Sequence, residues 1–371
     1  MAVKRSHLLS IGIVGLPNSG KSTLFNSITK CSVPAENFPF CTIDKNVGVV
    51  KIPDDRLEDL AGHYNARKIV SSAIKFVDIA GLVKGASRGE GLGNKFLSHI
   101  REVDVILYVL RAFSSENITH VYNRVDPLED MQIVESELIL KDMDTVKRKI
   151  GDLEKLARSN DEKATEMLRF MKELLAHLDE GRPAIEYKMT DDEAEFAREL
   201  WLLSNKQRMY LLNIREGVEE PELDNWEQEL KEYIPKEDHE FVIRADVKLI
   251  GELSDMDSAE REEFLSVFDE EPAELDEIVG LAYKRLDLIT FYTGNESECN
   301  AWTIAKGATV AEAAGVIHSD LEDRFITADV VNVDKLVKLG GWTGVKDAGL
   351  IENHSRDYLV QDGDYVVVNN G

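Results

Sequence analysis

The sequence predicts an α/β protein whose main sheet is interrupted by a helical hairpin and followed by a small β-rich module. Three observations predict this fold class: a glycine-rich loop between a strand and a helix near the start of the chain, apolar residues at coiled-coil spacing in its middle, and short strands with turn residues at its end. A chain of 371 residues is long enough for two or three domains, and 43% hydrophobic residues are enough for a packed core.

The glycine-rich loop runs from Gly15 to Ser22 with the sequence GLPNSGKS, which matches the P-loop pattern G-x-x-x-x-G-K-[S/T]. The apolar run 8–14 predicts a buried strand before it, and residues 23–28 predict the start of a helix after it, which is the context the motif requires. Backbone N–H groups of such a loop and the helix N-terminus face phosphates. We therefore expect Lys21 to contact the β- and γ-phosphates and the Ser22 hydroxyl to bind Mg²⁺.

A second motif, D-x-x-G, follows a strand-like run and extends from Asp78 to Gly81. An aspartate at a strand end can hold Mg²⁺ through water, and the N–H of Gly81 can sense the γ-phosphate. Five glycines between residues 81 and 93 predict a switch segment that orders on nucleotide binding, with an ordinary surface loop as the alternative. Between the two motifs, Thr42 could be the second protein ligand to Mg²⁺, or an ordinary loop threonine.

The segments GLPNSGKS, NFPFCTI and DIAGLVKGASRGEGLGNKFL together resemble the YchF group of Obg-related P-loop proteins, the Obg-like ATPases. The resemblance covers nearly the whole chain. It implies a Ras-like P-loop domain over residues 8–285, a helical hairpin inserted at 127–200, and a C-terminal TGS domain of β-grasp (ubiquitin-like) fold over 286–370. It also implies cytoplasmic ATP hydrolysis and association with the ribosome.

Site residues follow from the two motifs and from this resemblance together. Ser22 and Thr42 would hold Mg²⁺ together with Asp78, while Lys21 and Gly81 would act on the γ-phosphoryl group. The phosphate-binding residues would be Gly15, Asn18, Ser19, Gly20, Lys21, Ser22 and Thr23. An asparagine at position 18 can also help hold K⁺ against the phosphates in related proteins.

The base-reading motif departs from the N-K-x-D of GTP-binding relatives, since the strand before it ends in Asn213-Ile214-Arg215-Glu216. Adenine has no N1–H or 2-amino donor, so the loss of the aspartate removes the main reason to choose guanine. Asn213 could bond N7 or the 6-amino group, and the backbone of Ile214 could read the adenine edge, with Glu216 completing a pattern that resembles the ATP-preferring members. Alternatively, Asn213 only caps a strand end.

The residue that follows the D-x-x-G motif also departs from the pattern of Ras-like enzymes. Ras-like enzymes place a glutamine directly after D-x-x-G to orient the attacking water, and this chain has Leu82 there. His120, in a segment that resembles the family, is our hypothesis for the water-orienting residue, and a structural loop histidine is the alternative. Slow intrinsic turnover is expected either way.

The helical hairpin and the C-terminal module are predicted from the spacing of apolar residues and of strand and turn residues. Apolar residues recur at four- and three-residue intervals in two segments, which predicts an antiparallel helical hairpin. These residues are Ile139, Met143, Val146, Ile150 and Leu153 in the first segment, and Met167, Met171, Leu174 and Leu178 in the second. Beyond residue 288 we expect two strands, a helix over 310–317, and a closing strand, Asp-Gly turn and strand over 358–366.

The net charge of the chain restricts the kinds of partner that it can bind. A net charge of −26 argues against a protein that binds nucleic acid by charge alone, and no apolar run reaches membrane-spanning length. We expect a cytoplasmic monomer that binds ATP and the ribosome or ribosome-associated factors, and neither a membrane nor a specific DNA sequence. The prediction is a Mg²⁺-dependent, ATP-preferring P-loop hydrolase that acts as a switch in translation or the stress response. A GTPase of the same fold and a nucleotide-gated binding adaptor with incidental hydrolysis are the alternatives.

Overall fold

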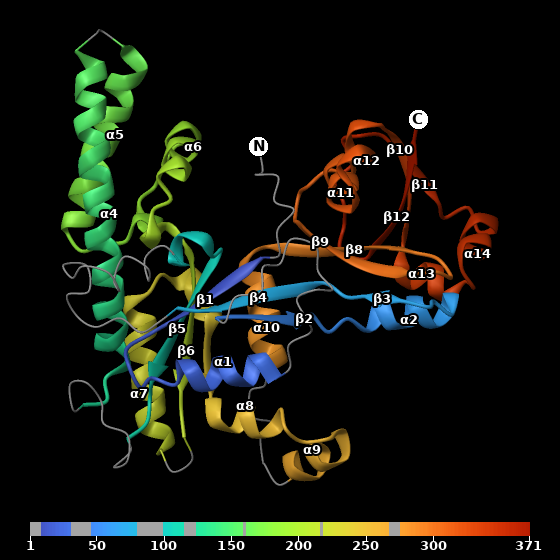
Figure 1. Cartoon of the computed structure of the whole chain (residues 1–371), viewed down its shortest axis with the longest axis horizontal. Coiled ribbons are helices and arrows are strands. Elements are labelled where there is room, and N and C mark those ends of the chain that lie inside the picture. Colours follow the sequence, from blue (N-terminus) through green and yellow to red (C-terminus); the bar gives the residue numbers. More distant parts are fainter. Residues whose placement is uncertain are drawn as a thin grey trace.

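The computed structural model describes residues 9–30, 46–79, 99–114, 124–158, 161–215, 218–266 and 275–371. Two six-stranded sheets lie side by side, and a long helical hairpin stands off the first of them (Figure 1). The predicted fold class, an α/β P-loop domain with a helical hairpin and a C-terminal β domain, is confirmed.

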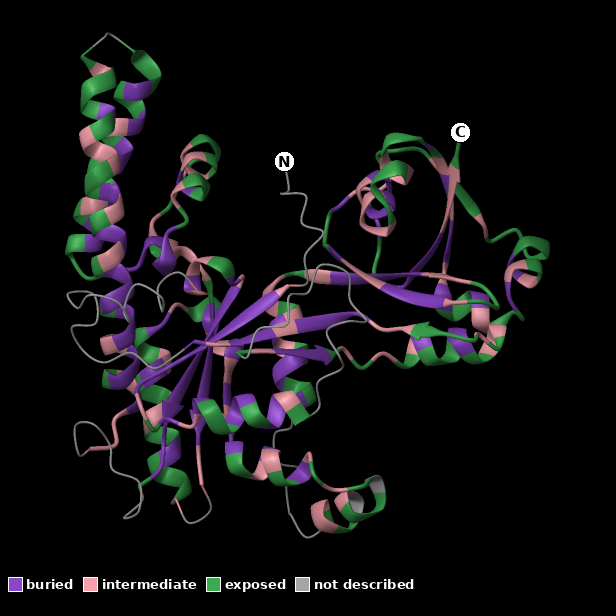
Figure 2. Cartoon of the chain, in the orientation of Figure 1, coloured by how far each residue is buried: buried purple, intermediate pink, exposed green. Residues whose placement is uncertain are grey.

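The first sheet has the strand order β2-β4-β1-β5-β6-β7. β2 is antiparallel to β4 and the other neighbours are parallel, so the carboxyl ends of five strands lie at one edge. The bounds are β1 Ser10–Val14, β2 Val47–Lys51, β4 Ala73–Asp78, β5 Val105–Arg111, β6 Gln207–Asn213 and β7 Val242–Ala245. Its strands read as apolar runs because helices cover both faces, which Figure 2 shows as buried strands at the centre of the molecule.

Different helices bury the two faces of this sheet. One face packs on α1 (Lys21–Lys30), α8 (Val247–Leu253) and α10 (Leu275–Arg285), and α9 (Ser258–Leu265) follows α8 along the chain. The other face packs on the base of α4 and on α7 (Glu220–Tyr233). The phosphate loop therefore lies between β1 and a helix that is held firmly against the sheet.

The hairpin consists of α4 (Pro127–Ala157) and α5 (Glu162–Asp179), each N-capped by the preceding aspartate. The apolar positions expected from the spacing form the seam between the two helices, which confirms the hairpin. The chain returns through a 3₁₀ turn, η3 (Ala184–Glu186), then α6 (Asp191–Leu200) and a second 3₁₀ turn, η4 (Leu203–Asn205), to β6.

The second sheet has the order β11-β10-β12-β8-β9-β3. Helix α11 (Val310–Ile317) packs on one face, as expected from the sequence, and Leu359 makes only an isolated bridge to Thr309, so the strand expected before the Asp-Gly turn is wrong. The remaining bounds are β8 Leu288–Gly294, β9 Cys299–Ala305, α12 Ser319–Asp323, β10 Phe325–Asn332, α13 Val333–Lys338, α14 Trp342–Asp347, β11 Glu352–His354 and β12 Asp364–Asn370.

Between β2 and β4 the chain leaves the first sheet and joins the second. Strand β3 (Ile69–Val70) pairs in parallel with β9, and α2 (Asp55–Tyr64) packs against the second sheet and α13. Figure 1 shows this excursion beneath the C-terminal strands. The division of the chain at residue 286 thus stays a prediction, because residues 55–70 pack with the C-terminal module although they precede it by some 200 positions.

Candidate nucleotide-binding site

The phosphate loop requires glycine at both of its ends. Gly15 and Gly20 have φ angles of 155° and 108°, and Asn18 between them has a φ of 65°. A Cβ atom at Gly15 would approach the carbonyl oxygen of Val109 to less than 3.0 Å, and one at Gly20 would approach the Nδ2 of Asn213 equally closely. The loop is therefore pressed against β5 and β6, and side chains at either glycine would force them apart.

Lys21 and Asp78 face each other at the carboxyl edge of the sheet. Lys21 is only 6% exposed, and its Nζ donates a hydrogen bond to the carbonyl of Leu16 at 2.6 Å. Burial lowers the pKa of Lys21 to about 8, and the charge of Asp78 acts in the opposite direction. Burial likewise raises the pKa of the Asp78 carboxyl, against the charge of Lys21. A phosphate beside Lys21 would supply the negative charge that favours its ammonium form.

The oxygen atoms around Lys21 fit a hydrated Mg²⁺. Asp78 Oδ1 and Ser19 Oγ are buried without a hydrogen-bond partner in the described part of the chain, and Ser22, the second residue of α1, is exposed. Carboxylate and hydroxyl oxygens are the ligands that Mg²⁺ prefers, with the rest of its shell taken from water and phosphate. Among the residues with described positions, no three His, Cys, Asp or Glu side chains form a metal cage. The Asp78 carboxylate and the two serine hydroxyls therefore fit a hydrated metal.

Asn213 braces the loop. It is 4% exposed, its Nδ2 donates to the Ser19 carbonyl at 2.8 Å, and its Oδ1 accepts from the Val247 N–H at 3.2 Å. One amide thus ties the phosphate loop to the first residue of α8. The N–H of Ile214 donates to the carbonyl of Ala245 at 3.0 Å, so its own carbonyl is the backbone group left for a purine.

The structure brings together the described part of the predicted site, from Gly15 to Thr23 with Asp78, Asn213 and Ile214, at the carboxyl edge of the first sheet. This is where open α/β sheets bind ligands. Five of the positions discussed above, namely Thr42, Gly81, Leu82, His120 and Glu216, lie outside the described residues, and their roles stay predictions.

One cluster beside the base-reading loop was not expected from the sequence. The guanidinium groups of Arg111 and Arg215 lie 4.6 and 4.3 Å from the ring centroid of Phe113, on the loop that follows β5. Arg111 is buried, and its Nε donates to the Phe113 carbonyl at 3.0 Å. The only signal in the sequence was an arginine at the end of an otherwise apolar strand. The cluster fixes the residue that follows Ile214.

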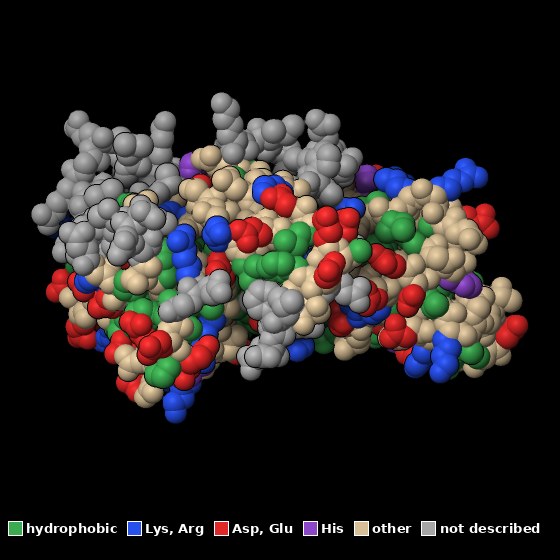
Figure 3. Space-filling model, turned by 90° about the horizontal axis from the view of Figure 1, so that it is seen from below, with side chains coloured by type: hydrophobic (Ala, Val, Ile, Leu, Met, Phe, Trp, Pro, Cys, Tyr) green, Lys and Arg blue, Asp and Glu red, His purple; other side chains and the backbone are tan. Residues whose placement is uncertain are grey.

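One cavity among the described residues lies away from this site. It measures about 840 Å³ and lies between α2, the end of β2, α8 and the start of α10. Figure 3 views the molecule from below, the side toward which α8 and α9 lie in Figure 1, and shows hydrophobic side chains near the middle of this face, among acidic and basic ones. We place the nucleotide at the P-loop because an open phosphate cradle recognises its ligand with backbone N–H groups rather than with volume. None of the helices that the structure describes is both long and apolar enough to cross a membrane.

Comparisons with known proteins agree with this geometry. A family model described as "50S ribosome-binding GTPase" matches residues 10–168, and the model of the YchF GTPase C-terminal region, described as a "Protein of unknown function", matches residues 288–370. The chain is 43% identical to the "Ribosome-binding ATPase YchF" of Bacillus subtilis over 96% of this chain and 98% of that protein. It is 40% identical to the protein of the same name from Escherichia coli O157:H7, over 95% and 96% of the two chains.

A solved structure supports the same assignment. The YchF GTPase of Schizosaccharomyces pombe superposes with a TM-score of 0.83 at 32% identity, covering 97% of both chains. Near-complete coverage at this identity extends to the hairpin and the C-terminal sheet as well as the P-loop. The chain belongs to the YchF family of P-loop proteins.

Proposed function

We propose that this protein is a Mg²⁺-dependent ATPase that binds the ribosome and acts there as a nucleotide-controlled switch. The observation that carries the proposal is the buried Lys21 in a glycine-constrained phosphate loop, near enough to Asp78 for their charges to interact, in a chain whose relatives are named ribosome-binding ATPases. Regulation of translation or of the stress response is the process we infer, and the cytoplasm is its location.

The chain's own groups have distinct tasks in hydrolysis. Lys21 exchanges the Leu16 carbonyl for the β- and γ-phosphates and neutralises charge that develops on the γ-phosphoryl group. Ser22, Thr42 and Asp78 would hold Mg²⁺, which supplies further neutralisation when bound. Gly81 would donate its N–H to the γ-phosphate, and His120 would orient the attacking water in place of the missing glutamine.

The preference for ATP follows from the base-reading loop. The carbonyl of Ile214 can accept a hydrogen bond from the 6-amino group of adenine, whereas the O6 of guanine would face it as a second acceptor. An unmatched buried polar contact of this kind costs about 1–3 kcal/mol, which is about a 5- to 150-fold preference. Asn213, already bonded to Ser19 and Val247, would add a contact to N7 through its second amide hydrogen.

Calorimetric titration of nucleotide-free protein with ATP and with GTP, each with Mg²⁺, tests this proposal. We expect ATP to bind more tightly, and we expect the double variant Ile214→Lys with Glu216→Asp, which restores N-K-x-D, to gain GTP affinity. Tighter GTP binding by the wild type would contradict the proposal and favour the GTPase alternative. Co-sedimentation with ribosomes in ATP-analogue and ADP states tests the partner.

Two further roles can be tested in the same preparation. His120→Ala should lower kcat while ATP affinity is unchanged, and equal turnover would exclude His120 as the water-orienting group. Hydrolysis rates in K⁺ and Na⁺ test whether Asn18 helps to hold a potassium ion, and identical rates would exclude it.

A further inference from the structure

Lys206 holds the end of the helical turn that follows the glycine-rich switch segment. This turn, residues 99–102, leads directly into β5. The Nζ of Lys206 donates to the carbonyl oxygens of Arg101 at 2.9 Å and Val103 at 2.8 Å. Carbonyls at a helix C-terminus have no partner within the helix, and a cation satisfies both their hydrogen bonding and the helix dipole. The Nζ of Lys206 also lies 5.6 Å from the ring centroid of Trp201.

The residues directly before Lys206 hold the root of the hairpin. Asp142 of α4 is 1% exposed and accepts three hydrogen bonds: from the Leu203 N–H at 2.8 Å, the Ser204 N–H at 2.7 Å and the Ser204 hydroxyl at 2.6 Å. The Ser204 Oγ in turn accepts from the Ala184 N–H at 3.0 Å, on the chain that returns from α5. Both sides of the hairpin are therefore fastened to η4.

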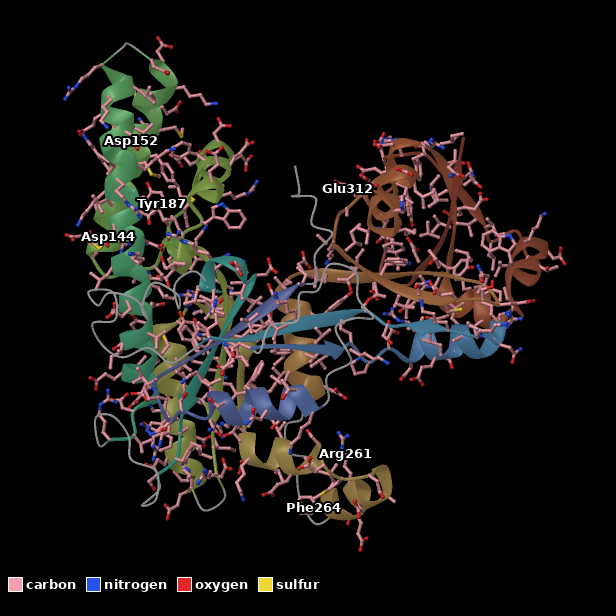
Figure 4. All side chains as sticks on the ribbon, in the orientation of Figure 1. Asp144, Asp152, Tyr187, Arg261, Phe264 and Glu312 are labelled. Atoms are coloured by element: carbon pink, nitrogen blue, oxygen red, sulfur yellow. The ribbon has the colours of Figure 1, made fainter. Side chains whose placement is uncertain are left out.

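The return segment is itself packed on α5. The ring of Tyr187 lies 5.9 Å from that of Phe170 and 5.4 Å from that of His177, between centroids, and its hydroxyl donates to Glu173 at 3.0 Å. Figure 4 shows Tyr187 in the return segment, between the hairpin and α6. A displacement of η4 would thus move the hairpin as a unit rather than bend it.

Charge also joins the helical turn to the hairpin. Burial raises the pKa of Asp142 to about 6, while the hydrogen bonds from Ser204 and Leu203 and the positive charge of Arg101 oppose this rise. Arg101 is therefore near enough to α4 to act on a buried carboxylate, and its own carbonyl is one of the two that accept a hydrogen bond from Lys206. The contacts of residues 203–206 form a continuous path from the turn at 99–102 to both sides of the hairpin.

We propose that residues 203–206 couple the nucleotide state to the position of the helical hairpin, with Lys206 as the positioning residue that joins the turn at 99–102 to this coupling segment. For the turn at 99–102 and the hairpin to move independently, the two charge-assisted hydrogen bonds of Lys206 and the hydrogen bonds of the buried Asp142 carboxylate would have to break. The inference rests on the proposed nucleotide switch. It adds that the hairpin is an output of that switch and that Lys206 transmits to it.

Hydrogen exchange provides a test that does not depend on the partner. Amide exchange is compared between ADP and a non-hydrolysable ATP analogue for residues 99–106, 138–146 and 203–206. In the wild type we expect nucleotide-dependent differences in all three segments. Lys206→Met should keep the difference at 99–106 and lose it at 138–146, while nucleotide affinity stays within about twofold of wild type. Lys206→Arg, which can still reach the two carbonyls, should restore the difference.

The matched control is Lys155→Met on the same hairpin, where the side chain is exposed and its ion-pair partner among the residues that the structure describes is the exposed Asp152. This control should behave as wild type. Retention of the nucleotide-dependent difference at 138–146 in Lys206→Met, or its absence from the wild type, would overturn the proposal.

Ribosome binding separates this inference from the proposed function. If the partner is the ribosome, the ratio of its affinities in the two nucleotide states should fall toward one in Lys206→Met, from a wild-type ratio of about 5- to 150-fold. An intact exchange pattern in a wild type that binds no ribosomes would refute the proposed partner and still support the coupling.

Discussion

Gly20→Ala offers the sharpest test of the phosphate loop. The new Cβ would lie less than 3.0 Å from the Nδ2 of Asn213, and the φ of 108° at this position is one that an alanine avoids. The backbone strain contributes about 1–3 kcal/mol. Displacement of the Asn213 amide breaks its 2.8 Å bond to the Ser19 carbonyl, which adds about 1–3 kcal/mol for buried groups left unpaired.

The two contributions together amount to about 2–6 kcal/mol, which corresponds to a loss of about 30-fold to 10⁴-fold in ATP affinity. Titration calorimetry with Mg·ATP measures the loss, and thermal unfolding followed by circular dichroism shows whether the protein is still folded. We expect the loss in binding because the loop can relax to a non-binding conformation while the sheet beneath it stays packed.

Gly151→Ala is the matched control. Gly151 lies within α4, and a Cβ there would meet nothing within 4 Å. This substitution should leave ATP affinity unchanged and stabilise the helix by up to about 1 kcal/mol. ATP affinity of Gly20→Ala within threefold of wild type would refute the reasoning. If the overlap with Asn213 is the cause, the double variant Gly20→Ala with Asn213→Ala should bind better than the sum of the two single losses predicts.

Three other predictions concern protonation, metal and stability. Burial lowers the pKa of Lys21 to about 8, and a bound phosphate restores its ammonium form. Binding of Mg·ATP should therefore take up about half a proton at pH 8 and almost none near pH 6.5. Calorimetry in two buffers of different ionisation enthalpy measures this uptake, and a binding enthalpy at pH 8 that does not depend on the buffer would contradict the prediction. Asp78→Asn should lower the affinity for ATP in the presence of Mg²⁺ about 10- to 100-fold and leave the affinity for ATP in EDTA unchanged. An equal loss of ATP affinity in the two conditions would place Asp78 away from the metal. Arg208→Met should destabilise the first unfolding transition in urea by about 3–5 kcal/mol, because it removes the ion-pair partner of the buried Glu135 and leaves the buried Asp238 paired with Arg285 alone. Arg244→Met, whose carboxylate partners are mostly exposed, should change it by less than about 1 kcal/mol, and similar effects of the two would refute the distinction.

Short sequence patterns predicted the parts of this protein whose structure depends on residues close together in the sequence. The phosphate loop follows from glycines that no other residue can replace at Gly15 and Gly20, and the hairpin follows from apolar spacing that both helices need. Strand β3 was not predicted because two residues carry no periodicity, and its extended conformation depends on pairing with β9, some 230 positions later. The two bonds of Asn213 also join residues far apart in sequence, so the motif indicated a base contact but not the bracing of the loop.

Both structures attached to the first sheet can be traced from β4, the strand that ends at Asp78. At its start, β4 follows β3 after two residues, and the second of these, Ser72, donates its hydroxyl to the Ala301 carbonyl of the C-terminal sheet at 3.0 Å. Through β1, the same sheet reaches β5, whose preceding turn is held by Lys206 and so by the hairpin root. A change at the γ-phosphate that shifts Asp78 therefore acts on two rigid attachments, the C-terminal sheet through the α2–β3 excursion and the hairpin through residues 203–206. Since these attachments use separate contacts, Lys206→Met should uncouple the hairpin while the C-terminal sheet still responds to nucleotide, which a single undivided rigid body would not allow.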